Sequence, residues 1–157
     1  MKRTTQLANR FREVMLHGTW IANTNYQQQL SNLDWQTAAT QYATLNTVAL
    51  LAQHIHYYIA GLKQVLEGGP LAIRDKYSFD FPAMESQSQW RRFLQQFFDD
   101  AGALAQLIEE MPEEKLAAPF VEERYGTYER NLEGMIEHCY YHLGQTVLIT
   151  KLVKARS

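Results

Sequence analysis

Residues 135–153 read MIEHCYYHLGQTVLITKLV, and apolar side chains recur along this segment at helical spacing. His138 and His142 stand four residues apart within it, and Gln145 follows three residues later. Residues four apart on an α-helix share one face, with Cβ atoms roughly 5–6 Å apart, so both imidazoles can reach one point beside the helix. The segment therefore predicts a helix that carries two converging histidines, with Gln145 on the same stripe.

The composition predicts a single all-α domain over residues 1–157. Of the 157 residues, 46% are hydrophobic and 12% aromatic, which is enough to fill one core. Helical spacing dominates, and the sequence contains no repeat, no low-complexity tract and no linker that would separate two domains.

The charge balance argues against binding to nucleic acid or to a membrane surface. The chain has 15 Lys and Arg against 17 Asp and Glu, a net charge of -2, and no basic stripe. Residues 35–62 carry no charged side chain, but Gln, Asn and His interrupt them too often for a membrane span. The start MKRTTQLANRF lacks the apolar run of a signal peptide, and Cys139 is the only cysteine. We therefore expect a cytoplasmic protein.

Four long helices are expected. The first covers residues 4–30, and the second follows a cap at Asn46 and ends at the Gly68, Gly69, Pro70 break. Asp34 is predicted to cap a short helical segment between them.

The third helix follows a capping-box pattern, Ser86 with Gln89, and stops at Pro112. The fourth begins near Thr127 and ends near Lys154. Two of the three joins are long, which favours a bundle with long crossover connections and allows the second and third helices to lie parallel.

Converging imidazoles most often bind a metal ion, because neutral ring nitrogens are good ligands for Zn, Ni, Fe or Cu. A third ligand must come from another helix, and the candidates are His54 and His56 on the second helix and His17 on the first. His54 and His56 lie about 200° apart around their helix, so only one can face the site, and periodicity does not choose between them. The alternative interpretation is that the histidines only bond tyrosines or carbonyl groups at a bundle surface.

Spacing excludes several familiar sites. A zinc-protease motif requires Glu after the first histidine, where this chain has Cys139, and no ferritin-like set of Glu-x-x-His motifs is present. What remains is a mononuclear three-histidine centre with an open position.

Cys139 is predicted to be a small buried residue. Tyr58 and Tyr141 are interpreted mainly as packing, although a tyrosine hydroxyl beside a metal can donate a hydrogen bond to a substrate.

The segments HIHYYIAGLKQVLEGG and HCYYHLGQ resemble the DinB-like superfamily of bacterial four-helix bundles, which includes thiol transferases of the bacillithiol and mycothiol type. The family pattern has a histidine in the second long helix, a glycine about four turns later, and H-x-x-x-H-x-x-Q in the fourth helix. His54, Gly68, His138, His142 and Gln145 match that pattern. The segments GTWIANTNYQQQL and DKYSFDFP extend the likeness over nearly the whole chain.

The resemblance implies an up-down-down-up four-helix bundle, a Ni or Zn ion held by His54, His138 and His142, and a homodimer. His56 is then a neighbour of the site and the alternative ligand. Tyr58 and Tyr141 are the other predicted neighbours.

The expected function is that of a divalent-metal-dependent enzyme. A metal with an open position lowers the pKa of a bound water or thiol, which suits transfer of a low-molecular-weight thiol to a small electrophile, or its hydrolysis. Gln145 would orient His142 or a substrate oxygen. The sequence identifies no catalytic base. The alternative is a non-catalytic helical protein that binds metal or acts in a stress response.

Overall fold

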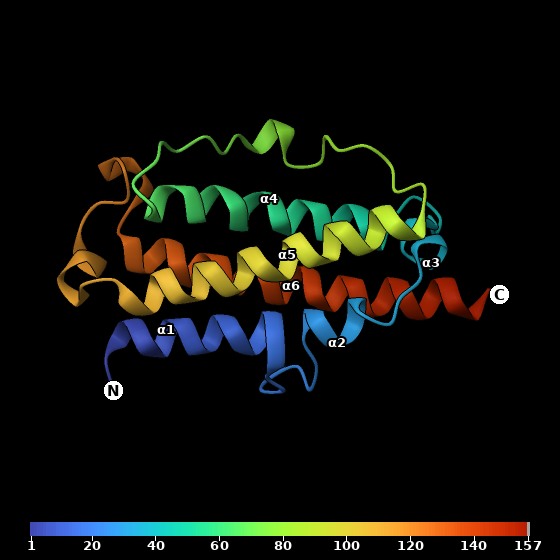
Figure 1. Cartoon of the computed structure of the whole chain (residues 1–157), viewed down its shortest axis with the longest axis horizontal. Helices are drawn as coiled ribbons and strands as arrows, with labels where there is room; N and C mark the ends of the chain where they lie inside the picture. The colour runs from blue at the N-terminus through green and yellow to red at the C-terminus, as the bar shows by residue number, and fades with distance from the viewer. Residues whose placement is uncertain (157) are drawn as a thin grey trace.

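The computed structural model describes residues 1–156, which form helices joined by loops (Figure 1). The four longest helical segments are α1 (Arg3–Arg12) with its π-helical continuation η1 (Glu13–His17), α4 (Val48–Leu66), α5 (Gln87–Glu110) and α6 (Tyr128–Ala155). The shorter ones are α2 (Tyr26–Leu30), α3 (Trp35–Ala39), η2 (Asp75–Tyr77), η3 (Glu113–Ala117) and η4 (Glu123–Tyr125). No β-strand occurs within residues 1–156, so the all-α prediction is confirmed.

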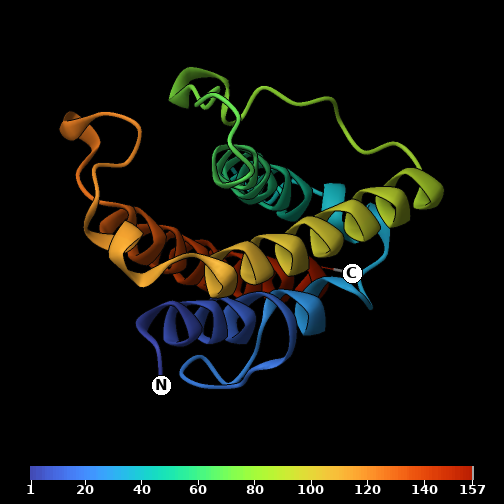
Figure 2. The ribbon, with the colours of Figure 1, turned by 60° about the vertical axis from the view of Figure 1, so that its left-hand side comes forward.

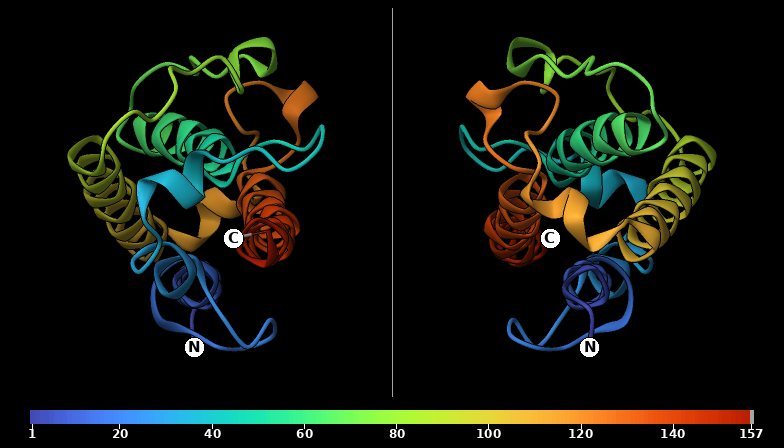
Figure 3. Two further views of the ribbon diagram at one scale, coloured as in Figure 1. Left: turned by 90° about the vertical axis from the view of Figure 1, so that its right-hand side faces the viewer. Right: turned by 90° about the vertical axis from the view of Figure 1, so that its left-hand side faces the viewer.

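The four long helices occupy four corners when the molecule is viewed end-on (Figure 3). Both α1 and α4 pack against α5 and against α6. In Figure 1, α1 and α6 run from left to right, whereas α4 and α5 run from right to left. Every long helix contributes to one apolar core, whose members include Leu7, Phe11, Ile55, Ile59, Trp90, Phe97, Leu104, Ile136 and Leu143.

The connection formed by residues 67–86 crosses the length of the bundle. It leaves the end of α4 and returns along the outer side of α4 to reach the start of α5, as Figures 1 and 2 show. Residues 111–127 instead join helix ends at the same end of the bundle, and η3 and η4 take up their length. One of the two long joins that were expected to cross therefore does so.

The prediction of one helix over residues 4–30 is wrong, because the chain leaves the helix at Gly18. A Cβ at Gly18 would lie 2.4 Å from Cα of Glu13, so the chain folds back over the preceding turn at a point where only glycine fits. The side chain of Asn25 closes the loop. Its Oδ1 accepts from the Gln28 amide at 2.8 Å and caps α2, and its Nδ2 donates to the Gly18 carbonyl at 2.8 Å.

Thr47, and not Asn46 as predicted, caps α4. The Thr47 hydroxyl accepts a hydrogen bond from the Leu50 amide at 3.1 Å. At its other end α4 stops where expected, because Gly68 adopts a φ of 93°, a left-handed conformation that ends helices and that glycine adopts without strain.

Three other predicted boundaries are confirmed. The Asp34 side chain caps α3, and Ser86 caps α5 by accepting from the Gln89 amide at 3.2 Å. The last residue of α5 is Glu110, two residues before Pro112, which cannot continue the helical hydrogen-bond ladder.

Within residues 1–156, none of the helices combines the length and the apolar character that crossing a membrane requires. The stretch without charged residues contributes the first part of α4, and there Gln53 and His54 are buried. Buried polar side chains need hydrogen-bond partners. The groups that surround His54 form the candidate site.

Candidate metal centre

Three histidines from two helices meet in the interior. His54 lies on α4, while His138 and His142 lie on α6, which packs against α4. One ring nitrogen from each of the three lies within 4.8 Å of the others. His54 and His142 are buried, with 4% and 6% of their surface exposed, and His138 is partly exposed.

Local helix geometry brings two of the three histidine rings together. His138 and His142 are one turn apart on α6, and their ring centroids are 4.6 Å apart. The packing of α4 on α6 supplies the rest, since it brings the His54 ring to within 5.0 Å of the His138 ring and 4.7 Å of the His142 ring. The sequence pattern alone could not provide this second step.

Hydrogen bonds fix the tautomers of two of the rings. Nδ1 of His54 lies 2.8 Å from the carbonyl oxygen of Ser78, and Nδ1 of His142 lies 2.6 Å from Oε1 of Gln145. Both oxygens are acceptors, so each Nδ1 carries the proton and donates it. Each Nε2 is therefore unprotonated and keeps a lone pair, the state in which an imidazole nitrogen can bind a metal ion.

The spacing of one pair of nitrogens, those of His54 and His138, fits a small divalent ion. Nε2 of His54 lies 3.1 Å from Nε2 of His138. Two nitrogen ligands at about 2.05 Å from zinc, at the tetrahedral angle, are about 3.3 Å apart. The donor set consists of three neutral nitrogens, which suits Zn and Ni better than the oxygen-binding Mg or Ca.

The environment keeps all three rings neutral at neutral pH. Burial lowers the pKa of His138 to about 4, and the charges that His142 and His54 would carry act in the same direction. Burial also lowers the pKa of His54, although the hydrogen bond to Ser78 and the charge of Asp75 oppose the shift. For His142, burial lowers the pKa against the hydrogen bond to Gln145. Neutral imidazole is the metal-binding form.

Aromatic side chains enclose the cluster. The Phe79 ring stacks on the His54 ring, with centroids 3.9 Å apart and planes 7° apart. Tyr58 meets His54 and His138 edge-to-face, at centroid distances of 5.1 Å in both cases. Its hydroxyl donates to Oδ1 of Asp75 at 2.7 Å, which ties η2 to α4.

Tyr141, the other predicted neighbour, lies at the outer edge. Its ring meets that of His142 edge-to-face at 4.8 Å, but 64% of its surface is exposed. It therefore shields one side of His142 and faces solvent with the other.

A cavity of about 450 Å³ opens beside His138, between α4 and α6. Its wall is mostly apolar, and Arg130 and Asn131 add polar groups. Arg130 is already paired with Glu137, at 3.2 Å. The lining consists of Tyr58, Leu62, Ile73, Phe120, Arg130, Asn131, Gly134, Met135 and His138.

The remaining candidates from the sequence lie elsewhere. His56 faces α5, where its Nε2 lies 2.7 Å from Oδ2 of Asp100, so it does not join the other three histidines. His17 is exposed at the end of η1. Cys139 is fully buried, and burial raises the pKa of its thiol far above the ordinary value.

Sequence reasoning missed Ser78 and Asp75 as parts of the site. Ser78 acts through its backbone carbonyl, which every residue possesses, so no side-chain signal could have marked it. Phe79 alternates with Tyr77 and Phe81 in the sequence, a pattern that is typical of an extended segment but does not show that the segment covers a histidine.

The chain matches no family model, and it has no significant match among curated proteins or solved structures. The geometry of the three histidines is therefore the observation on which any assignment of function depends.

Proposed function

We propose that the chain is a divalent-metal-dependent enzyme of the DinB-like superfamily. In this proposal His54, His138 and His142 hold Ni or Zn, and the reaction is transfer of a low-molecular-weight thiol to a small electrophile, or its hydrolysis. The observation that carries the proposal is the convergence of three neutral imidazoles, two of which have Nδ1 committed to an oxygen acceptor. The directions of the four long helices support the up-down-down-up arrangement and so the superfamily.

A divalent ion held by these three histidines would lower the pKa of a water or thiol that binds to it. The residues of the chain supply the rest. Ser78 and Gln145 hold the rings of His54 and His142 in place, and Phe79 excludes water from one face of His54.

The cavity beside His138 is the proposed substrate site. Its volume of about 450 Å³ and its mostly apolar wall suit a small organic electrophile. Burial raises the pKa of Tyr58, and its hydrogen bond to Asp75 adds to the shift, so its hydroxyl stays protonated at neutral pH. Tyr58 accordingly lines the cavity with a protonated hydroxyl and does not act as a base.

A second candidate function is non-catalytic metal binding, as in a stress-response protein. The burial of His54 and His142 favours it, because a closely covered ion is less accessible to substrate. The cytoplasmic location and the homodimer belong to the proposal on the strength of the resemblance alone.

Metal analysis of the untagged protein tests the proposal. After incubation with Zn or Ni and removal of excess ion, we expect one ion per chain, and the absence of stoichiometric metal would refute it. With metal present, turnover of a generic electrophile with a low-molecular-weight thiol separates a catalyst from a binder. Hydrolysis without thiol identifies the second reaction, and inactivity toward the whole panel favours the non-catalytic function.

A further inference from the structure

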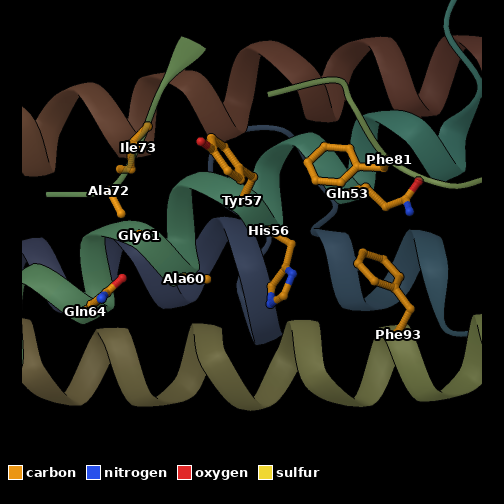
Figure 4. Close-up of a pocket in the computed structure, with 10 residues that line it drawn as sticks. All are labelled: Gln53, His56, Tyr57, Ala60, Gly61, Gln64, Ala72, Ile73, Phe81 and Phe93. Atoms are coloured by element: carbon orange, nitrogen blue, oxygen red, sulfur yellow. The ribbon is translucent and has the colours of Figure 1, made fainter. Parts of the chain in front are cut away.

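A second cavity, of about 380 Å³, lies on the other side of α4 (Figure 4). It is bounded by α4, α5 and the connection 67–86, and its walls share no histidine with the candidate metal centre. Three aromatic side chains, Tyr57, Phe81 and Phe93, form much of its wall. The remaining lining residues are Gln53, His56, Ala60, Gly61, Gln64, Ala72 and Ile73.

His56 is the one imidazole among the residues that line this cavity, and Asp100 holds its ring. Nε2 of His56 donates to Oδ2 of Asp100 at 2.7 Å, and Asp100 is 6% exposed. The same carboxylate accepts from Nε2 of Gln96 at 2.9 Å and pairs with Nζ of Lys63 at 3.3 Å. Burial alone would raise the pKa of Asp100, but these hydrogen bonds lower it below its ordinary value, so the group is a carboxylate.

This arrangement determines what His56 can offer to a ligand. Because a carboxylate only accepts, Nε2 carries a proton, and when the ring holds that one proton Nδ1 keeps a lone pair. Within residues 1–156, no group makes a hydrogen bond with Nδ1 of His56. The ring points from α4 toward α5 between Ala60 and Phe93 (Figure 4). The cavity therefore contains a hydrogen-bond acceptor among aromatic walls.

Charge restricts the ligand further. No Lys or Arg lines the cavity, so an anion would find no counter-charge there. No Asp or Glu lines the cavity either, and Asp100, which lies behind His56, is 6% exposed and pairs with Lys63. The residues around the cavity thus fit a neutral ligand.

We propose that this cavity binds a neutral, planar aromatic molecule that carries a hydroxyl group, that is, a phenol. The ring lies against Tyr57, Phe81 and Phe93, and the hydroxyl donates to Nδ1 of His56. The small side chains of Ala60, Gly61 and Ala72 provide the space. The cavity wall includes none of the three histidines of the candidate metal centre.

Amide chemical shifts of the full-length, metal-free, ¹⁵N-labelled chain test the proposal with three probes. Phenol should shift the amides of Ala60, Gly61 and Ala72 in a saturable manner, with a Kd on the order of 1 mM. Toluene has the same shape without the donor, and cyclohexanol has the donor without the flat ring, so both should bind at least about 5-fold more weakly. Equal affinity for the three probes, or no saturable shift with phenol, overturns the proposal.

Two substitutions locate the binding. Ala60→Leu fills the cavity and should weaken phenol binding by about 10-fold or more, whereas Ala117→Leu, an exposed site on η3, should leave it unchanged. His56→Gln should reduce the preference for phenol over toluene toward unity. Circular dichroism of each variant verifies the fold. Shifts centred on His138 and His142, or binding of tetramethylammonium in place of phenol, contradict the assignment.

Discussion

His54 donates a hydrogen bond from Nδ1 to the carbonyl oxygen of Ser78 at 2.8 Å, and this bond joins the middle of α4 to the connection 67–86. The acceptor is a backbone atom, so it persists whatever side chain stands at position 78. The bond leaves Nε2 of His54 unprotonated, with its lone pair directed toward Nε2 of His138 at 3.1 Å. The fold of the connection, and not only the two helices, thus prepares the candidate metal centre.

His54→Ala should abolish stoichiometric metal binding while leaving the helical content unchanged. It removes one of three ligands, so the loss of affinity should exceed the about 10–100-fold effect of residues that only orient ligands. Metal analysis and circular dichroism measure the two effects. His56→Ala is the matched control on the same helix and should retain the ion. The reverse pattern would show that His56 is the ligand from α4.

Gln145→Leu should weaken metal binding by about 10–100-fold, because Nδ1 of His142 loses the acceptor that orients its ring. Competition with a chromophoric chelator gives the affinity. Gln145→Glu keeps an acceptor at the same distance and should bind metal at least as tightly as the original chain. If the Leu and Glu variants have the same affinity, Gln145 does not orient His142.

Phe79→Ala should lower the affinity for metal by about 10-fold, since it removes the ring stacked 3.9 Å from that of His54 and admits water to the site. Tyr77→Ala changes an aromatic residue of the same segment that has no ring contact with the histidines, and it should leave the affinity unchanged. A chelator titration of both variants makes the comparison. Equal losses in the two would indicate a general loosening of the connection.

The metal-free protein should lose stability as the pH falls from about 7 to about 4. The pKa values of His54, His138 and His142 are lowered in the folded chain, that of His138 to about 4, whereas an unfolded histidine has a pKa of about 6.5. Between these values the unfolded chain binds more protons, so the free energy of unfolding decreases by at most about 1.4 kcal/mol per pH unit for each group. The partly exposed His138 contributes less than this limit.

Urea denaturation at several pH values measures that slope. The variant His138→Leu lacks one of the three groups and should show a shallower decrease between pH values of about 7 and 4. A slope equal to that of the original chain would mean that His138 has the same pKa in both states.

Asn25→Ala should destabilise the fold by about 1 kcal/mol, because α2 loses its cap and the Gly18 carbonyl loses a donor. Asn25→Asp keeps the cap and loses only the donor, so its effect should be smaller. Urea denaturation ranks the variants, with the exposed substitution Ser31→Ala as the control. If the variants Asn25→Ala, Asn25→Asp and Ser31→Ala are equally stable, the Asn25 side chain does not stabilise the loop that follows η1.

Helix boundaries could be predicted from sequence wherever a local residue determines them. Asp34, Ser86 and Pro112 act on the backbone within one turn, so their effect is readable without tertiary information. The break at Gly18 could not be read in this way, because a single glycine is tolerated inside a helix. Its necessity depends on the close return of the chain to Glu13.

In the candidate site, too, only the part that a single helix determines could be predicted from the sequence. The spacing of His138 and His142 is a property of one helix, and the sequence therefore predicts their convergence. The third member depends on how α4 is rotated between α5 and α6. That rotation turns His54 toward α6 and His56 toward Asp100 on α5, and hydrophobic periodicity places the two histidines equally well on either side of the core.

The connection 67–86 contacts both the candidate metal centre and the cavity that contains His56, since Ser78 and Phe79 contact His54 while Phe81 lines that cavity. Only one residue, Asp80, separates Phe79 from Phe81, so a change at either place acts on one short piece of backbone. Allosteric coupling between two such sites is reciprocal by thermodynamic necessity. If filling the cavity changes the affinity for an ion by some factor, binding of the ion must change the affinity for the cavity's occupant by the same factor.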